Sequence, residues 1–327
     1  TLDRSSAASD VYKRQLAKQF MDGISVLPMR DGVSASQFRV PNEPFTGTLL
    51  EFLCANFSNV ACDVWRTRLL NKEVYHQYNG QYYSIAYHAN FTDYRGQTIY
   101  YYRSLADEPV VPFNYEIIFE NDRFMVVDKP HFLTVIPGGN YVTETLLSRL
   151  KMHSNNPALT PIHRLDRQTA GLVLFCKQRK WRGAYQQLFA TQAIHKTYHA
   201  IAPYKPTLSF PKKVRLCLVR GEPFYTMQVG AGAPNSETDI ALLAISTDRQ
   251  WAKYLLTPST GKLHQLRVHL HHLGVAIKND DFYPQIRHRA PDDFSAPLQL
   301  LAKSLAFTDP ITGEDYAFYS RQALLLP

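Results

Sequence analysis

The order of strands and helices is the feature that most constrains the fold. Short runs of apolar residues predict strands at 116–120, 123–128, 172–175, 196–201, 240–245 and 251–257. Trp181, Ala184, Tyr185 and Leu188 recur at helical spacing and predict one helix that packs on a sheet. Because these elements do not alternate as regular βαβ units, the sequence predicts an α+β fold built on a largely antiparallel mixed sheet.

A smaller α/β domain is predicted at residues 21–106. Thr48 and Glu51 have the spacing of a helix-capping box, and a second short helix at 59–71 is expected to present Arg66, Arg68 and Lys72. Asn79-Gly80 lies between β-rich flanks and predicts a tight hairpin. Two short helices followed by a hairpin resemble the small RNA-binding domain named for a ribosomal small-subunit protein. An unrelated cap domain is the alternative.

The remaining segments complete the predicted organisation. Residues 1–20 are polar and patternless and are predicted to be a disordered or vector-derived leader. Residues 107–112 contain two prolines and are predicted to be a linker. Residues 113–327 then form the larger domain.

Charge and composition favour an anionic partner. The chain has 36 Lys and Arg against 28 Asp and Glu, which gives a formal charge of +8, and this balance suits nucleic acid. No run of about 18 apolar residues is present, so no membrane association is expected. The sequence gives no sign of an obligate protein partner. Cys54, Cys62, Cys176 and Cys217 form no CxxC pair and are predicted to be reduced, which indicates a cytoplasmic location.

Residues 161–175, P-I-H-R-L-D-R-Q-T-A-G-L-V-L-F, carry the strongest chemical signal. Asp166 lies between Arg164 and Arg167, just before a Gly that enters an apolar strand. Neighbouring cations favour an ionised carboxylate, as a nucleophile requires. Taken alone, the segment favours an ion pair between Asp166 and either arginine on a surface turn over a nucleophile.

The same segment resembles the H-R-L-D-x-x-T-S-G-L-L signature of RluA-family pseudouridine synthases. Further similarities follow in the family's order: I-I-F-E-N-D at 117–122, V-V-D-K-P at 126–130, K-T-Y at 196–198, T-G-K-L-H-Q-L-R-V-H-L at 260–270 and L-A-K-S-L-A-F-T-D-P at 301–310. The resemblance covers about two thirds of the chain. It implies the pseudouridine synthase fold, RNA as the partner (rRNA, tRNA or both), and isomerisation of uridine to pseudouridine without cofactor or metal.

The resemblance also implies roles for particular residues. Asp166 corresponds to the family's nucleophile or base, Arg267 to the basic residue paired with it, and Tyr198 to the ring that stacks on the target uracil. Arg164 is a candidate to fill the stack left by a flipped base. The substrate-binding candidates are His163, Arg164, Arg167, Thr169, Lys196, His264 and Gln265.

The sequence departs from the family pattern at several positions. Ala170 replaces Ser, Lys262-Leu263 replaces Arg-Thr, Asn279-Asp280 replaces Gly-Asp, and no His precedes Ala302. These changes bear on RNA contacts and subfamily more than on catalysis.

Two other patterns are weaker. His264, His269, His271 and His272 could suggest zinc, but no HExxH motif and no adjacent acidic or cysteine ligand is present, so no metal is expected. Basic groups at 179–182, 212–215 and 287–289 are either phosphate contacts or solvated surface.

Two alternative functions are weighed against the enzyme. One is a catalytically silent RNA-binding protein on the same fold, which would not require Asp166, Tyr198 and Arg267 together. The other is a hydrolase with Asp166 as covalent nucleophile, which would need a second carboxylate as acid.

Overall fold

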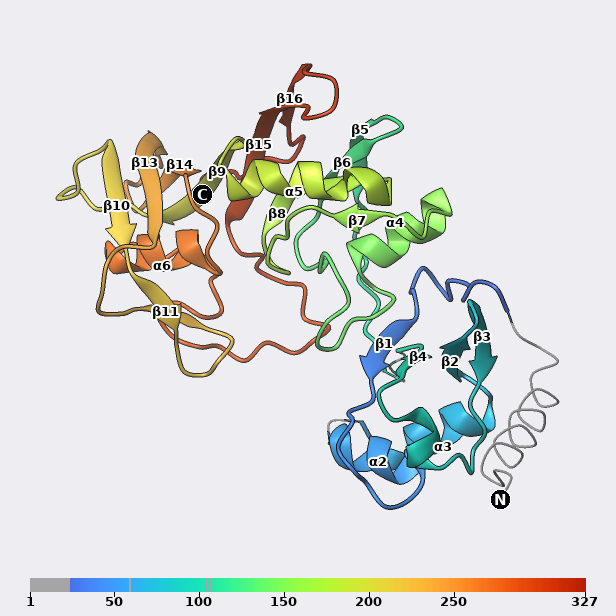
Figure 1. Ribbon diagram of the computed structural model, residues 1–327. Helices are drawn as coiled ribbons and strands as arrows, with labels where there is room; N and C mark the ends of the chain where they lie inside the picture. The colour runs from blue at the N-terminus through green and yellow to red at the C-terminus, as the bar shows by residue number, and fades with distance from the viewer. Residues whose placement is uncertain (1–23, 59, 104, 106) are drawn as a thin grey trace, which may run out of the picture. The chain divides into compact units, whose positions relative to one another are not determined.

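The computed structural model describes residues 24–58, 60–103, 105 and 107–327, and the leader predicted at 1–20 lies outside them. The chain divides into two compact units, an N-terminal unit of residues 1–104 and a C-terminal unit of residues 105–327 (Figure 1).

In the described part of the N-terminal unit, a four-stranded antiparallel sheet packs with two short helices. The sheet has the strand order β1-β4-β2-β3. Apolar side chains from both helices, among them Leu49, Leu53 and Trp65, form a buried core with the sheet. The elements are β1 (Ser36–Arg39), α2 (Leu49–Asn56), α3 (Cys62–Leu70), β2 (Val74–Tyr78), β3 (Gln81–Ser84), the 3₁₀ turn η1 (Phe91–Tyr94) and β4 (Thr98–Tyr101).

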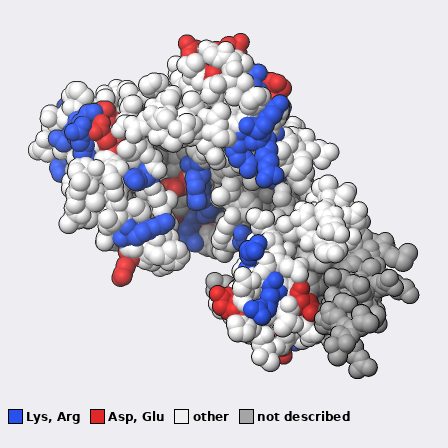
Figure 2. Space-filling model, in the orientation of Figure 1, with Lys and Arg blue, Asp and Glu red and all other residues white. Residues whose placement is uncertain are grey.

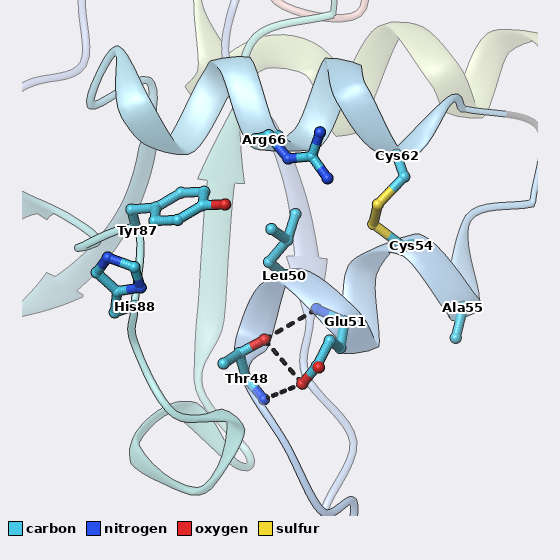
Figure 3. Close-up of a pocket in the computed structure, with 9 residues that line it drawn as sticks. All are labelled: Thr48, Leu50, Glu51, Cys54, Ala55, Cys62, Arg66, Tyr87 and His88. Atoms are coloured by element: carbon cyan, nitrogen blue, oxygen red, sulfur yellow. Dashed lines mark hydrogen bonds between the residues drawn. A yellow bond between two sulfur atoms is a disulfide. The ribbon is translucent and has the colours of Figure 1, made fainter.

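Local signals in this unit are largely confirmed. The Thr48 hydroxyl accepts a hydrogen bond from the Glu51 backbone N–H, and the Glu51 carboxylate accepts one from the Thr48 N–H, which completes the capping box (Figure 3). Asn79 and Gly80 have positive φ and join β2 to β3. The expected exposure of Arg68 is wrong: Arg68 is buried, with its guanidinium over the Trp65 ring.

The cysteine prediction is wrong for one pair. Cys54 and Cys62 form a disulfide with their Cα atoms 4.9 Å apart (Figure 3). Cys54 lies in the last turn of α2 and Cys62 is the first residue of α3, so the short connection brings the two helix ends together. Cys176 and Cys217 are free, as expected. Reduced cysteines therefore no longer support a cytoplasmic location.

The C-terminal unit is built on a ten-stranded mixed sheet. The main path is β10-β13-β14-β9-β15-β8-β6-β5, with β16 paired to β15 and β7 paired to β8. Only β15 and β8 run parallel, so the predicted α+β class and largely antiparallel sheet are confirmed. The strands are β5 (Glu116–Glu120), β6 (Phe124–Lys129), β7 (Thr160–Pro161), β8 (Ala170–Cys176), β9 (His195–Pro203), β10 (Lys212–Leu216), β13 (Ser236–Ile245), β14 (Trp251–Pro258), β15 (Leu300–Thr308) and β16 (Asp315–Tyr319).

Helices cover both faces of this sheet, which explains the continuous apolar runs of β6 and β8. Val127 and Val173 pack with α4 (Leu146–Ser154), whereas the alternate residues Val126 and Leu174 pack with α5 (Arg182–Ala190). The α5 helix follows the 3₁₀ turn η2 (Arg179–Trp181). Leu266 and Leu270 of α6 (Gln265–His272) pack on β9, β13 and β14. Strand β8 is thus packed on both faces by helices, which holds its first residues in place.

The contact between β8 and β15 requires glycine at position 171. Gly171 has φ +110°, and a Cβ there would lie 2.2 Å from the Ala302 carbonyl oxygen. Any side chain would push the two strands apart. This close approach fixes the strand that begins directly after the Asp166 loop.

The segment predicted as a linker is bound to the C-terminal unit. The Glu108 carboxylate accepts hydrogen bonds from the backbone N–H groups of Val142, Thr143 and Glu144 at 2.6–3.0 Å, and Val111 is buried. Residues 107–112 therefore belong to the structure of this unit rather than to a free connection. None of the helices within the described ranges is long and apolar enough to cross a membrane.

Candidate active site

Asp166 projects from the loop between β7 and β8. The loop is closed by a hydrogen bond from the Thr169 N–H to the Asp166 carbonyl, at 3.1 Å. It is also held by Lys129, a fully buried residue whose ammonium donates to the carbonyls of Pro130, Leu133 and Arg167 at 2.8–3.2 Å. Burial lowers the pKa of Lys129 to about 7, against the attraction of Asp166. Lys129 thus fixes the backbone beside the carboxylate.

Arg267 is the ion-pair partner of Asp166. Its Nη1 lies 3.2 Å from Asp166 Oδ2, across 101 positions of sequence. Burial by itself would raise the pKa of Asp166, but the charges of His264 and Arg267, the Arg267 hydrogen bond and Arg164 together hold it below its usual value. The surface-turn alternative, in which Asp166 pairs with Arg164 or Arg167, does not describe this geometry.

Asp280 holds Arg267 in place. Its two carboxylate oxygens accept from Nη2 and Nε of Arg267 at 2.6 and 2.8 Å, so the guanidinium fork is bidentate on Asp280. The Asp280 side chain is fully buried and that of Arg267 is 3% exposed. Although burial opposes its charge, the bonds to Asp280 and the field of both carboxylates raise the pKa of Arg267 above its usual value.

His264 contacts the same carboxylate from the start of α6. Its Nε2 lies 3.8 Å from Asp166 Oδ2, and its Nδ1 is hydrogen-bonded to the Tyr283 hydroxyl at 3.0 Å. Burial lowers the pKa of His264 to about 4, so the ring is neutral at pH 7. At neutral pH the charges of Arg267, which contacts Asp166 directly, and of Arg164 therefore keep Asp166 ionised.

Asp166 opens into a cleft of about 1150 Å³. The Asp166 side chain is 22% exposed, so the carboxylate is partly accessible from this space. Tyr198 of β9 lines the cleft, and burial followed by the charge of Asp166 raises the pKa of its phenol, which stays protonated. Figure 2 shows a hollow on this face of the C-terminal unit with Lys and Arg side chains around it.

The cleft brings together all the predicted site residues, but not in equivalent positions. Arg164 is exposed. Lys196 lies over the Phe189 ring, which also stacks on His163. Burial lowers the pKa of His163 to about 3, and its Nε2 accepts the Leu174 N–H, so it shapes the loop.

Three other predicted contacts are engaged within the protein. The Gln265 amide bonds Thr260, Lys262, Glu237 and Thr238. The Arg167 guanidinium lies 5.0 Å from the Tyr141 ring centroid and donates to the Pro291 carbonyl. Thr169 is buried at the loop turn. These residues hold the walls of the cleft.

Sequence reasoning missed Asp280 and Lys129 as site residues. Asp280 lies in one of the noted departures, Asn279-Asp280, where the departure itself is the one signal that could have pointed to it. Lys129 lies in the V-D-K-P motif, but the motif does not show that this lysine is buried and bonded to the loop that carries Asp166. Phe282, whose ring lies 4.8 Å from the Arg267 guanidinium, carries no local signal.

The histidine cluster does not converge on one point. His269 is buried against the Ser236 hydroxyl at 2.9 Å, and the His271 ring stacks on Tyr283. Among the side chains that the structure describes, no group of three or more His, Cys, Asp or Glu could hold a metal ion.

The three basic groups differ in their surroundings. Lys213 and Arg215 are paired with Glu237 of β13, and Arg289 is paired with Asp281 and Asp293. Arg179 and Lys180 are exposed, and within residues 107–327 neither has an acidic partner. The group at 179–182 therefore presents two adjacent exposed cations of this kind, and Arg287 is the exposed cation of the 287–289 group.

Comparison with known proteins gives consistent results. The sequence model described as RNA pseudouridylate synthase matches residues 123–272. The dual-specificity RNA pseudouridine synthase RluA of Pasteurella multocida is 30% identical over 62% of this chain and 91% of its own length. Ribosomal large subunit pseudouridine synthase D of Neisseria meningitidis is 27% identical over 63% of this chain and 58% of its own length. The tRNA pseudouridine synthase C of Vibrio vulnificus is 28% identical over 61% of this chain and 87% of its own length.

A solved structure agrees with the fold. Human RNA pseudouridylate synthase domain containing 1 superposes with a TM-score of 0.52 at 23% identity, covering 66% of this chain and 86% of the human one. The matched stretch 123–272 contains Asp166, Tyr198 and Arg267, which the fold gathers in one cleft. Likeness in sequence over nearly the whole of a relative, together with this shared fold, shows that the chain belongs to the RluA family of RNA pseudouridine synthases.

Proposed function

We propose that this protein isomerises specific uridines of rRNA, tRNA or both, with Asp166 as the residue that starts cleavage of the glycosidic bond. The observation that carries the proposal is a carboxylate kept ionised by Arg267 and open to a cleft lined by Tyr198. Relatives named for ribosomal and for transfer RNA support both substrate classes. A cytoplasmic location is part of the proposal, since rRNA and tRNA are found there, and RNA is the one partner that the proposal needs.

The cleft supplies what the reaction requires. Uracil must leave the ribose through nitrogen 1, turn, and rejoin through carbon 5; the proton on carbon 5 is then lost and nitrogen 1 gains one, so that no atom is added or removed. The base has to be flipped out of its stack for this. The protonated Tyr198 ring offers a surface for the uracil, and exposed Arg164 can occupy the vacated stack through its planar guanidinium. No oxidation state changes, so these side chains suffice without a cofactor.

The two alternatives receive less support. A hydrolase needs a second carboxylate as general acid, and Asp280, the carboxylate that shares Arg267 with Asp166, is fully buried and bonded to Arg267 through both oxygens. A silent RNA-binding protein has no need for the buried Asp280–Arg267–Asp166 series, because binding alone requires no ionised carboxylate facing the cleft.

Mapping of pseudouridine tests the proposal directly. Total RNA from a strain that lacks this gene is incubated with purified protein, and pseudouridines are located by chemical sequencing. New pseudouridines at specific rRNA or tRNA positions are expected. An unchanged map with properly folded protein would contradict the proposed function.

Replacing the two exposed cations Arg179 and Lys180 with Ala is expected to weaken RNA binding and flatten its salt dependence. Each lost phosphate contact lowers the slope of log affinity against log salt by about 0.7 to 0.9. The Lys213→Ala, Arg215→Ala double variant is the matched control. Its cations are held by Glu237, so it is expected to change the slope less. Affinity titrations across salt concentrations measure both, and equal slopes for the two variants would refute the assignment.

Removal of residues 1–104 is expected to lower RNA affinity while the C-terminal unit still folds. The basis is the proposed RNA-binding role of the N-terminal unit, and binding titrations with one RNA measure it.

A shorter protein beginning at residue 113 also loses Glu108, which accepts three backbone hydrogen bonds. It is expected to be less stable by about 2 kcal/mol, on the scale of hydrogen bonds to a charged group, as measured by denaturant unfolding. Equal RNA affinity for the full-length protein and the protein without residues 1–104 would count against an RNA-binding role of the N-terminal unit.

A further inference from the structure

An exposed hairpin lies at the mouth of the cleft. Strands β11 (Leu218–Arg220) and β12 (Met227–Val229) pair outside the main sheet and project beside α6 (Figure 1). Phe224 at the hairpin tip is 79% exposed. A single exposed aromatic residue is ordinary on protein surfaces, but Phe224, Tyr225 and Arg220 line the same cleft as Asp166.

The hairpin is anchored rather than loose at its base. The Tyr283 hydroxyl accepts from the Met227 N–H at 2.8 Å and donates to the Met227 carbonyl at 3.1 Å. Leu218 and Met227 are buried with Val268 of α6. At the tip, Arg220 donates to the Phe224 carbonyl at 3.1 Å. Phe224 is therefore held out from a fixed base, which reduces the entropy lost when a ligand binds it.

Aromatic rings connect the tip to the catalytic carboxylate. Ring centroids are separated by 5.6 Å between Phe224 and Tyr225, 5.4 Å between Tyr225 and Phe282, and 5.3 Å between Phe282 and His264. His264 Nε2 in turn lies 3.8 Å from Asp166 Oδ2. The wall of the cleft on this side is thus a continuous series of rings that begins at the reacting centre and ends in solvent.

The size and charge of the cleft favour more than one nucleotide. Pockets for single small ligands measure about 300–1,000 Å³, and this cleft measures about 1150 Å³. Arg220 and Lys262 are exposed cations among its lining residues and suit phosphates on either side of a bound base. Glu222 at the tip is acidic and exposed, so the tip itself suits the face of a base rather than a phosphate.

We infer that the β11–β12 hairpin binds an unpaired nucleotide next to the target uridine, with its base stacked on the exposed Phe224 ring. This inference rests on the proposed function, since it supposes that the target uridine lies against Asp166. Aromatic side chains are the surfaces on which splayed single-stranded bases stack. The subsite favours uridines in loops or bulges whose neighbour is free to unstack, over uridines inside continuous helices.

The probe for this subsite is a fluorescein-labelled RNA heptamer with one central uridine between adenosines. Two further heptamers carry an abasic ribose directly 5′ or directly 3′ of the uridine. Binding to wild type, Phe224→Ala, Phe224→Trp and Tyr319→Ala is measured by fluorescence anisotropy at one salt concentration. Tyr319 is the matched control because it is an aromatic residue of similar exposure, 64%, that does not line the cleft.

The expected result is coupling between Phe224 and one neighbouring base. For wild type and for Tyr319→Ala, one abasic substitution should raise Kd roughly 5- to 150-fold, the range for loss of one base–aromatic stack. Phe224→Ala should bind the intact heptamer weaker by a similar factor and lose no more on the same abasic substitution. Phe224→Trp should retain the wild-type pattern because it keeps a stacking face.

Several outcomes would overturn the subsite. These are no measurable heptamer binding by wild type, indifference of wild type to both abasic substitutions, or an undiminished abasic effect in Phe224→Ala. Thermal unfolding of Phe224→Ala establishes that its fold is intact, and a misfolded Phe224→Ala leaves Phe224→Trp and the abasic series to decide. Because anisotropy needs no turnover, coupling without pseudouridine formation would contradict the proposed function alone, and activity without coupling would contradict the subsite alone.

Discussion

Asp166→Asn is expected to abolish pseudouridine formation, with a fall in single-turnover rate on the order of 10⁴-fold or more, the scale on which a catalytic nucleophile is lost. The amide has the shape of the carboxylate but neither its charge nor its nucleophilicity. Folding is expected to be preserved, because Arg267 keeps both bonds to Asp280. RNA affinity is expected to change little, since Asp166 is argued to act on the reacting bond.

The matched control is Asp239→Asn. Asp239 is an exposed carboxylate on β13 that pairs with Lys213 outside the cleft, and its replacement is expected to leave turnover unchanged. Single-turnover assays with RNA containing a mapped target uridine compare the two variants. Normal turnover by the Asp166→Asn protein would disprove the assignment of Asp166.

Arg267→Ala is expected to cause both a catalytic and a structural loss. Asp166 then lacks its cation, so burial raises the pKa of its carboxyl. Asp280 is left as a buried unpaired charge, which costs about 3–5 kcal/mol when one partner of a buried ion pair is removed. Denaturant unfolding measures the stability loss, and the salt slope of RNA affinity should stay almost unchanged because Arg267 meets no phosphate.

The pH profile separates the two effects. The reaction needs the carboxylate form of Asp166. Because the pKa of Asp166 is lowered, the single-turnover rate of the wild-type protein should not change with pH until well into the acidic range. When the counter-charge is lost, the pKa of Asp166 rises and the acid limb of the rate moves to higher pH. Arg267→Lys keeps a charge and should recover part of the rate, but an ammonium cannot bond Asp280 through a planar fork and also reach Asp166.

Asp280→Asn tests the same pairing with less disturbance. The amide still offers an oxygen to the Arg267 fork, so the fold should hold, while Arg267 is positioned less firmly toward Asp166. A smaller rate loss than that of Arg267→Ala is expected, with RNA affinity retained.

If Arg267→Ala instead lowered affinity with a flatter salt slope and kept its single-turnover rate, Arg267 would be an RNA contact and the pairing with Asp166 would have no catalytic role.

Local patterns predicted local structure well. The capping box of Thr48 and Glu51, the Asn79-Gly80 hairpin and strand 116–120 depend on contacts between residues close in sequence, and all three are present. The ordered motifs also indicated the family and directed attention to Asp166, Tyr198 and Arg267. For these features the determining interactions lie within a few positions, or the residues themselves carry the chemistry.

Other features depended on contacts between distant parts of the chain. Asp166 could have paired with either adjacent arginine, and only the packing of α6 beside the β7–β8 loop brings Arg267 to it across 101 positions. The sequence around Glu108 predicts a linker, and only the structure shows the backbone of residues 142–144 bonded to its carboxylate. The Cys54–Cys62 disulfide forms because the ends of two helices lie next to each other. Apolar periodicity says which face of an element is buried but not what covers it. The sequence by itself therefore indicated several of the element types and the family, and it pointed to Asp166 as the proposed reacting carboxylate, whereas the partners of that carboxylate, and the rings that lead from it to Phe224, were decided only by the tertiary structure.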